Sequence, residues 1–198
     1  MTDSAPQSGT MPEAIRYAQH LLQHDPSKAI EQLKEILGKV PQHPPALLLQ
    51  VLAHERLEEW DKAHSIIKPL AMEHPKWVDV HLTLARILEK LDDGDGAIAA
   101  LKIVVSLDQG HREAWRLLAD HLIATGDLQG GDRAYLRHIK CSSKNEDLQR
   151  AAASMISNEL AVAERGLKSY LKKAPTDVAA IRMLAEVAVR VERNNEAH

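Results

Sequence analysis

Aromatic side chains are nearly missing from this chain of 198 residues: they make up 3% of it, and phenylalanine does not occur. Strands favour aromatic and β-branched residues, whereas the alanines and leucines that take their place here favour helix. The composition therefore predicts a helical protein.

Three other features that mark particular classes of protein are also missing. Cys141 is the only cysteine, which excludes an intramolecular disulfide and is typical of a reducing compartment. No stretch reaches the roughly 18 consecutive apolar residues of a membrane span, and the N-terminal MTDSAPQSGT lacks the basic and apolar regions of a signal peptide. A formal charge of -3 leaves no basic footprint for nucleic acid or for a membrane surface. We therefore predict a cytoplasmic protein with no nucleic-acid or membrane partner.

What the chain does have is an internal repeat. Four similar segments, HDPSKA, EEWDKA, DDGDGA and GDLQGG, end at positions 29, 63, 97 and 131, which are equally spaced. A fifth segment ends at Ala163, two positions before the next equal step, so one repeat is shorter than the others. The residues at these steps are small, which lets two helices of one repeat approach closely. Apolar residues follow helical spacing within each repeat, which predicts helices at 11–24, 28–39, 45–57, 61–73, 78–91, 95–107, 112–125, 128–140, 146–157, 160–173 and 177–192.

The third and fourth repeats carry a more specific pattern. The fourth contains, in order, Trp115, Leu118, Ala119, Leu122, Gly131 and Tyr135. The equal steps and this pattern resemble the tetratricopeptide repeat, with its 34-residue period and W-x2-L-G-x2-Y…A-x3-F…P pattern. The resemblance implies an all-α, right-handed superhelix of about five helical hairpins plus a terminal helix at residues 11–198, after a flexible tail at residues 1–10. Gln50 and His54 fall at apolar positions of the pattern, so the register of the first helices in repeats one and two is open by one residue.

The last segment, TDVAAIRMLAEVAVRVERNNEAH, begins a sixth hairpin in which Ala197 is the small residue of the second helix. A helical array normally closes on a polar capping helix. We therefore expect either that the chain is a piece of a longer protein, truncated in the sixth repeat, or that self-association covers the terminal helix. The stretch YLKKAPTDVAAIRMLAEVAVRVERNNEA also resembles bacterial proteins in which a tetratricopeptide array precedes a sulfotransferase domain. That resemblance implies an alternative role as the regulatory or substrate-presenting arm of such an enzyme, although no residue here matches its phosphosulfate loop.

Eleven histidines raise the question of a metal site. His20 and His24 lie four residues apart on one predicted helix, a spacing at which two imidazoles can share a zinc ion. The HLLQH segment lacks the Glu of a metalloprotease helix, and no third potential zinc ligand lies at a spacing typical of a zinc site. Cys141 has no base at a spacing that indicates a nucleophile, and the glycines lack the order of a phosphate loop. A zinc-buffering protein is the weaker alternative; we predict a chain that is not an enzyme and has no metal or cofactor.

The remaining candidate site is a surface. In the family that this chain resembles, the first helix of each repeat lines a concave groove with positions 2, 5, 6, 9, 12 and 13. The resemblance implies that a protein or peptide partner contacts Leu48, Leu49, Leu52, Leu82, Arg86, Lys90, Arg116, Leu117, Asp120, Arg182, Met183 and Arg190. Apolar side chains between arginines suit an acidic or amphipathic partner. Two alternatives are open: some leucines belong to the core, or Arg86, Arg116 and Arg182 pair with neighbouring acids. The asparagines with which chaperone-binding members hold a C-terminal carboxylate are missing, so that activity is not expected.

Overall fold

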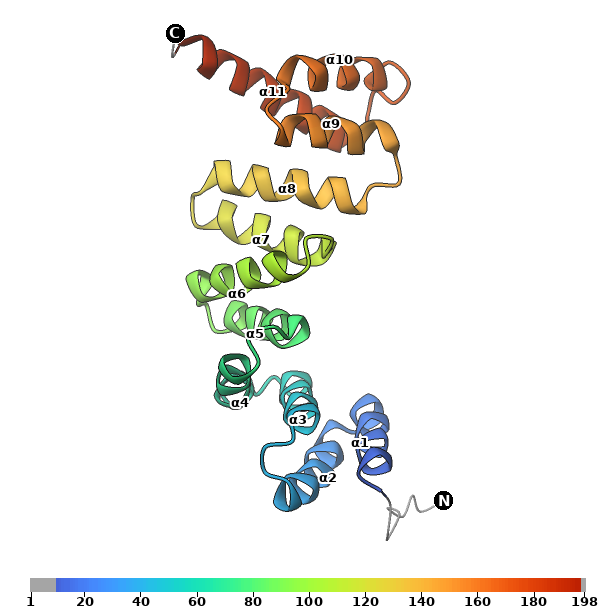
Figure 1. Cartoon of the computed structure of the whole chain (residues 1–198), viewed down its shortest axis with the longest axis vertical. Coiled ribbons are helices and arrows are strands. Elements are labelled where there is room, and N and C mark those ends of the chain that lie inside the picture. Colours follow the sequence, from blue (N-terminus) through green and yellow to red (C-terminus); the bar gives the residue numbers. More distant parts are fainter. Residues whose placement is uncertain (1–9, 197–198) are drawn as a thin grey trace. The chain divides into compact units, whose positions relative to one another are not determined.

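The computed structural model describes residues 10–196, which form helices joined by short turns (Figure 1). No strand occurs in this described part of the chain, so the predicted all-α fold is confirmed. The helices are α1 (Met11–His24), α2 (Pro26–Lys39), α3 (Pro44–Arg56), α4 (Trp60–Glu73), α5 (Val78–Lys90), α6 (Gly94–Leu107), α7 (Arg112–Ala124), α8 (Leu128–Ser142), α9 (Glu146–Ile156), α10 (Leu160–Leu171) and α11 (Val178–Glu196).

The chain divides into two compact halves, residues 1–103 and 104–198, and the division falls inside α6. In the N-terminal half α2 packs on α1 and α3, and α4 packs on α3 and α5. In the C-terminal half α8 packs on α7 and α9, and α10 packs on α9 and α11. Such neighbour-to-neighbour packing is typical of stacked helical hairpins, in which each helix buries its apolar stripe against the helices next to it in the sequence.

The turn inside the hairpins repeats one backbone geometry. Four residues with positive φ mark it, at 56°, 58°, 90° and 60°, respectively: Glu58, Asp92, Gly126 and Asn158. They follow one another at the same steps as the small residues of the repeats, including the shorter last step. Asp93 and Asp127 come next in two of these turns, and their carboxylates accept hydrogen bonds at 2.8 Å from the backbone N–H groups of Gly96 and Gly130. The internal repeat of the sequence therefore corresponds to one turn, with its N-cap, that recurs at the same spacing in the structure.

The first hairpin is tighter than the others. Asp25 alone joins α1 to α2, and its carboxylate accepts a hydrogen bond from the backbone N–H of Lys28 at 3.1 Å. α3 buries Val51 and His54. α1 buries Ala18 and Leu21, and each of them lies one residue after the position that corresponds to Val51 or His54 one repeat earlier. The one-residue slip that the sequence left open is thus present in α1 and absent from α3, because one residue replaces the longer turn of the later hairpins.

The two-residue deletion of the fifth repeat falls in its first helix: α9 has 11 residues, whereas α3, α5 and α7 have 13 each. The sequence KCSSKNEDLQ predicts a longer connection before α9, and this prediction is wrong. α8 continues to Ser142, so Cys141 lies in its last turn and residues 143–145 alone join the two helices. Asn145 then caps α9 by accepting hydrogen bonds from the backbone N–H groups of Asp147 and Leu148.

The two ends of the chain are described only in part. Residues 1–9 of the predicted tail lie outside the described residues, and the backbone N–H of Thr10 already donates to Glu13 Oε2 at 2.7 Å at the start of α1. α11 continues to Glu196, beyond its predicted end at residue 192. Ala197, the predicted small residue of a sixth hairpin, also lies outside the described residues.

Candidate functional site

One candidate surface combines leucines of α3 with cations of α5. We call it the α3/α5 surface and define it by Leu48, Leu52 and Glu55 of α3 with Arg86 and Lys90 of α5. Leu48 and Leu52 are half-buried and lie one turn apart, so they form one stripe along α3. Partial burial raises the pKa of the Glu55 carboxyl, and the positive charge of Arg86 opposes that rise. Arg86 of α5 is therefore close enough to Glu55 of α3 for its charge to act on that carboxyl.

Three of the predicted groove residues belong to the core instead. Leu49 of α3 and Leu82 of α5 are buried, and Met183 of α11 is only 1% exposed. A partner cannot reach these side chains, so their assignment to a contact surface is corrected. The physical reason is that a helix within the array packs on helices before and after it, which widens its buried stripe beyond the apolar positions of the repeat pattern.

Two predicted groove arginines of the C-terminal half have acidic partners within the chain. Arg116 Nη1 lies 2.9 Å from Asp120 Oδ2, one turn further along α7. Arg182 Nη2 lies 2.9 Å from Asp132 Oδ1 of α8, and its guanidinium lies over the Tyr135 ring, 4.3 Å from the ring centroid. The alternative in which these arginines pair with neighbouring acids is thus the one that the structure shows, and Arg182 connects α11 to α8.

Two further predicted residues of this half differ in what they offer. Arg190 is largely buried: its Nε donates to Glu186 Oε1 at 2.6 Å and its Nη1 to the carbonyl oxygen of Met155 at 3.3 Å. These bonds tie α11 to α9. Leu117 of α7 is half-buried and keeps part of its surface accessible.

α11 has a covered and an open apolar face. Ala180, Met183 and Val187 form the covered face and pack in one hydrophobic cluster with residues of α8, α9 and α10. The open face, so named from here on, consists of Val178, Ile181, Ala185 and Ala188, with Leu184 and Val191 at its edge. Val178 is 77% exposed and Ile181 is 47% exposed. Large apolar side chains on one exposed stripe are a second candidate contact surface.

The histidine pair of α1 does lie on one side of its helix. The ring centroids of His20 and His24 are 4.9 Å apart. Among the described side chains, no three or more His, Cys, Asp or Glu residues come together where they could hold a metal ion. Two imidazoles alone supply half of the four ligands that a structural zinc site uses. The helices of the described residues also include none with the length and apolar character needed to cross a membrane.

The family of the chain follows from a comparison with family models. The model of the tetratricopeptide repeat matches residues 20–87 and, overlapping them, residues 56–120, which together make up just over half of the chain. The chain belongs to the tetratricopeptide repeat family. The α3/α5 surface lies within the matched repeats, and α11 lies beyond them.

Solved structures share the fold of these tetratricopeptide repeats. A crystal structure of MamA aligns with 96% of this chain and 99% of that chain at a TM-score of 0.61 and 15% identity. The MamA RS-1 ArsTM double mutant has the same coverage, with a TM-score of 0.63 and 18% identity. A tetratricopeptide repeat protein from Parabacteroides merdae ATCC 43184 aligns with 94% of this chain and 75% of its own, with a TM-score of 0.62 and 17% identity.

At these identities the likeness concerns the fold alone. No curated protein sequence matches the chain. None of the matches described above carries a sulfotransferase domain in its name, so the role as a sulfotransferase arm stays a prediction.

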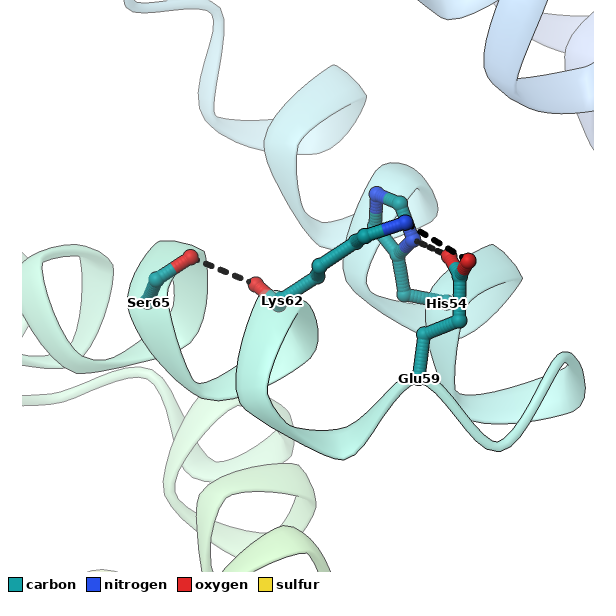
Figure 2. A network of polar contacts seen from close by, with 4 residues as sticks. All are labelled: His54, Glu59, Lys62 and Ser65. Carbon is teal, nitrogen blue, oxygen red and sulfur yellow. Dashed lines mark hydrogen bonds and ion pairs between the residues drawn. The ribbon is translucent and has the colours of Figure 1, made fainter.

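The tetratricopeptide repeat pattern has an apolar residue where this chain has His54, and sequence reasoning missed how the histidine is accommodated. His54 is buried, and its Nδ1 lies 2.6 Å from Glu59 Oε2 across the α3–α4 turn (Figure 2). Lys62 Nζ lies 2.7 Å from the other carboxylate oxygen, and the Ser65 hydroxyl donates to the Lys62 carbonyl oxygen at 2.7 Å. Hydrogen bonds from Lys62 and His54 lower the pKa of Glu59. The pairing avoids an unsatisfied buried imidazole, and a His five residues before a Glu across a hairpin turn was its only signal in the sequence.

Another polar contact occurs at the same positions in two successive repeats. Trp115 Nε1 donates to the carbonyl oxygen of Gln109 at 2.9 Å. At the same positions one repeat earlier, His81 Nε2 lies 3.1 Å from the carbonyl oxygen of Pro75. His81 Nε2 must carry the proton, because a carbonyl oxygen only accepts. His81 Nδ1 is buried without a hydrogen-bond partner among the described atoms. His81 thus replaces the tryptophan of the pattern and leaves one acceptor unsatisfied.

Proposed function

We propose that this tetratricopeptide repeat chain is a non-catalytic cytoplasmic scaffold that binds a protein or peptide partner through the α3/α5 surface. The observation that carries the proposal is the half-buried stripe of Leu48 and Leu52 on α3, one turn before Glu55, whose carboxyl is influenced by the charge of Arg86 on α5. The proposal assigns no catalytic residue, cofactor or metal. It retains the helix faces that the family resemblance predicts and leaves out the residues that are buried.

The chemistry of this surface suits an amphipathic helix with acidic residues at its edge. Leu48 and Leu52 present apolar area, and a partner that covers it gains about 25 cal/mol for each Å² removed from water. Lys90 is exposed and can meet a carboxylate of the partner, whereas the charge of Arg86 also acts on the Glu55 carboxyl of α3. An arginine next to apolar area is a frequent centre of binding energy in interfaces.

Site-specific photo-crosslinking in the source cells tests the proposal. A photoreactive phenylalanine analogue replaces Leu52 in one variant and, as a matched control, Met72 of α4 in another; Met72 is 76% exposed and lies on a second helix of a hairpin. We expect a discrete crosslinked protein from position 52 and none from position 72. Adding Lys90→Glu to the first variant should lower the yield about tenfold, because it reverses a charge at the surface.

Lys68→Glu is the matched charge control, because Lys68 is exposed on α4. It should leave the yield from position 52 unchanged. Equal crosslinking from positions 52 and 72, or a yield that does not respond to Lys90→Glu, would contradict the α3/α5 surface as the partner site. Circular dichroism of each variant checks that the helices are intact.

A further inference from the structure

Positive charge marks the exposed face of α8. Three cations follow one another along one side of this helix at successive turns: Arg133, Arg137 and Lys140. Arg133 and Lys140 are exposed, and Arg137 between them is half-buried. Lys144, exposed in the turn after α8, continues the series at the same spacing. We call these four cations the basic row.

The basic row has no acidic partner within the described part of the chain. Three other second helices differ from α8, because a cation in each of them pairs with an acid one turn before it: Lys28 with Asp25, Lys62 with Glu59, and Lys168 with Glu164. The charge of the basic row is therefore available to another molecule, whereas these other cations are neutralised by the chain itself.

The helix dipole of α8 accounts for one of these cations. Lys140 lies in the last turn, where a positive charge offsets the partial negative charge of the helix C-terminus. Arg133 and Arg137 lie before that turn, and the effect of the dipole is confined to it. The two arginines therefore have no role in α8 that the dipole explains.

The acids at the start of α8 are already bonded. The Asp127 carboxylate caps the helix by accepting a hydrogen bond at 2.8 Å from the backbone N–H of Gly130. Asp132, the one acid in the sequence of α8, bonds to Arg182 of α11. On the α7 side, His138 Nδ1 donates to the carbonyl oxygen of Arg112 at 2.8 Å, so this neighbour adds a cation and not an acid.

The α9 side adds one exposed acid at the far end of the basic row. Asp147 of α9 pairs with Arg150 at 3.6 Å. Glu146, the first residue of α9, is exposed and comes two residues after Lys144. Arg133 lies about 16 Å before Lys144 along the helix direction, which exceeds the screening length of about 8 Å at physiological salt. Glu146 therefore weakens the end of the basic row and leaves its start positive.

We propose that the basic row binds an acidic helix of a partner protein. The four cations are separated by four, three and four residues, so one stands at each helical turn of about 5.4 Å. A partner helix with carboxylates at the same intervals faces all four cations at once. Residues on one side of a strand repeat about every 6.6 Å instead, so the carboxylates of an extended segment would fall out of step.

Two other polyanions fit the basic row less well. Single-stranded nucleic acid is held by aromatic side chains that stack on its bases beside the cations, and the basic row contains only arginine and lysine. The net charge of -3 also repels an extended polyanion. A membrane-surface helix places apolar side chains next to its cations, whereas the residue one turn before Arg133 is the exposed Gln129. The inference goes beyond the proposed function and does not rest on it.

Fluorescence anisotropy with a labelled peptide tests the proposal on the whole chain. The probe is an alanine-rich helical peptide of about 20 residues with glutamates at the intervals of the basic row. The control peptide has the same composition, with its glutamates distributed around the helix. At low ionic strength the probe should bind at least about tenfold more tightly than the control peptide, because only the probe aligns its carboxylates with the cations. No binding of the probe, or equal binding of the two peptides, would overturn the proposal.

Charge reversal on α8 tests the residues. Arg133→Glu with Arg137→Glu should weaken probe binding at least about tenfold, because repulsion replaces attraction at two positions. Arg133→Gln with Arg137→Gln removes the charges without reversing them and should weaken it less. The matched control is Lys34→Glu with Lys68→Glu, which changes the net charge equally at exposed positions of α2 and α4 and should have little effect. Circular dichroism checks that each variant is folded. Wild-type binding by either folded α8 variant would contradict the basic row.

A charge-swapped probe and two other polyanions test the occupant. A peptide with lysines in place of the glutamates should prefer the charge-reversed α8 variant to the wild type. A single-stranded oligonucleotide and vesicles of phosphatidylserine and phosphatidylcholine should bind the wild type more weakly than the probe does. Tighter binding of either, with the same dependence on Arg133 and Arg137, would replace the acidic helix and overturn the proposal.

One more variant separates the basic row from the α3/α5 surface. Lys90→Glu should leave probe binding unchanged, and the photo-crosslink from position 52 should persist in the charge-reversed α8 variant. A probe that responds to Lys90→Glu and not to the α8 variants belongs to the α3/α5 surface, which overturns the present inference and leaves the proposed function in place. Loss of the crosslink from position 52 in the wild type, with probe binding intact, has the opposite meaning.

Discussion

Two helix pairs of the C-terminal half start from the same apolar pattern and differ in what covers it. α8 packs closely on α7, because Gly131 has no side chain at the crossing: a Cβ there would lie 3.2 Å from the carbonyl oxygen of Ala119 and would collide with Ile123. α11 packs on α10 through its covered face, and of the positions that correspond to Leu118 and Ala119, Leu184 is half-buried and Ala185 is exposed. The apolar pattern therefore indicates which face of a helix another helix can cover. The position of the neighbouring helix determines whether that face is buried.

The difference has an energetic consequence. A leucine or isoleucine that becomes fully buried contributes about 1.5–3 kcal/mol relative to an exposed one. In α7 that contribution goes into folding of the hairpin. In α11 Ile181 is 47% exposed, so only part of that contribution is used in the single chain. Substitutions on the two faces of α11, and on α7 and α8, should therefore differ in their effect on the stability of the chain.

The largest effect is expected within α11 itself. Met183→Ala removes a side chain that is 1% exposed, so we expect the free energy of unfolding to fall by about 2–5 kcal/mol. Ile181→Ala on the open face should lower it by only about 1 kcal/mol, because this side chain is 47% exposed and has less packing to lose. Urea unfolding measures both. Equal costs for the two substitutions would contradict the two-face description.

The α7–α8 contact is tested by one methyl group. Gly131→Ala should lower the free energy of unfolding by about 1–3 kcal/mol, because the new Cβ forces Ile123 and the α7 backbone away. Gly166→Ala is the matched control: Gly166 is inside α10, and a Cβ there meets nothing within 4 Å. The control should stabilise the chain by about 0.5–1 kcal/mol through helix propensity. A stabilising Gly131→Ala would show that α8 does not depend on the close approach.

The N-terminus of α11 makes its docking sensitive to acid. The backbone N–H of Ala180 donates to Asp177 Oδ1 at 3.0 Å, and the Tyr170 hydroxyl donates to Oδ2 at 2.9 Å. These hydrogen bonds lower the pKa of Asp177 below its ordinary value of 3.8. The ionised carboxylate therefore stabilises the folded chain above that ordinary value, and the stabilisation is lost as the pH falls through the lower, folded-state pKa.

Asp177→Asn keeps a capping oxygen and removes the charge, so the variant should lose less stability than the wild type on acidification. The difference at neutral pH should be at most about 1 kcal/mol, because the site is partly exposed. Urea titrations between neutral and acid pH measure both curves. The corresponding N-cap residue of α7 is a histidine, His111, whose Nδ1 accepts a hydrogen bond from the backbone N–H of Ala114 at 3.2 Å. Parallel curves for the wild type and the variant would contradict a role for the Asp177 charge.

The smallest effect compares two arginines at the same repeat position. Arg182→Gln removes both the contact with the Tyr135 ring and the ion pair with Asp132, so it should cost about 0.5–1 kcal/mol. Arg116→Gln removes an exposed pair within α7 and should cost less than about 0.5 kcal/mol. Thermal unfolding measures the two variants side by side. An equal cost would mean that Arg182 does not help to hold α11 on α8.

Much of the fold could be predicted because its signals are local. The small residues of the second helices and the apolar spacing of the first ones gave the hairpins, and the two-residue deletion was visible before its place in α9 was known. The continuation of α8 through Cys141 was missed, because Ser-Ser-Lys-Asn is typical of a turn while the last turn of α8 still packs. The slip of α1 could be stated only as an alternative, because it depends on the length of the turn at Asp25.

The candidate surfaces were less predictable than the fold. Repeat positions named Leu52, Arg86 and Lys90, which the structure leaves accessible, but they also named Met183, which it buries. They gave no sign that Arg182 would reach Asp132, which belongs to an earlier hairpin. Contacts between side chains that are distant in sequence depend on the rotation of each helix against its neighbours, and a single sequence does not report that rotation.

The sequence by itself determined the period, the helices and the turns of this protein, because these depend on interactions between residues a few positions apart. Only the tertiary structure decided that α11 buries Met183 and exposes Ile181, that His54 finds Glu59, and that Gly131 lies against Ala119. Burial is a property of two surfaces in contact, so an apolar pattern becomes core or contact surface only when the helix beside it is known.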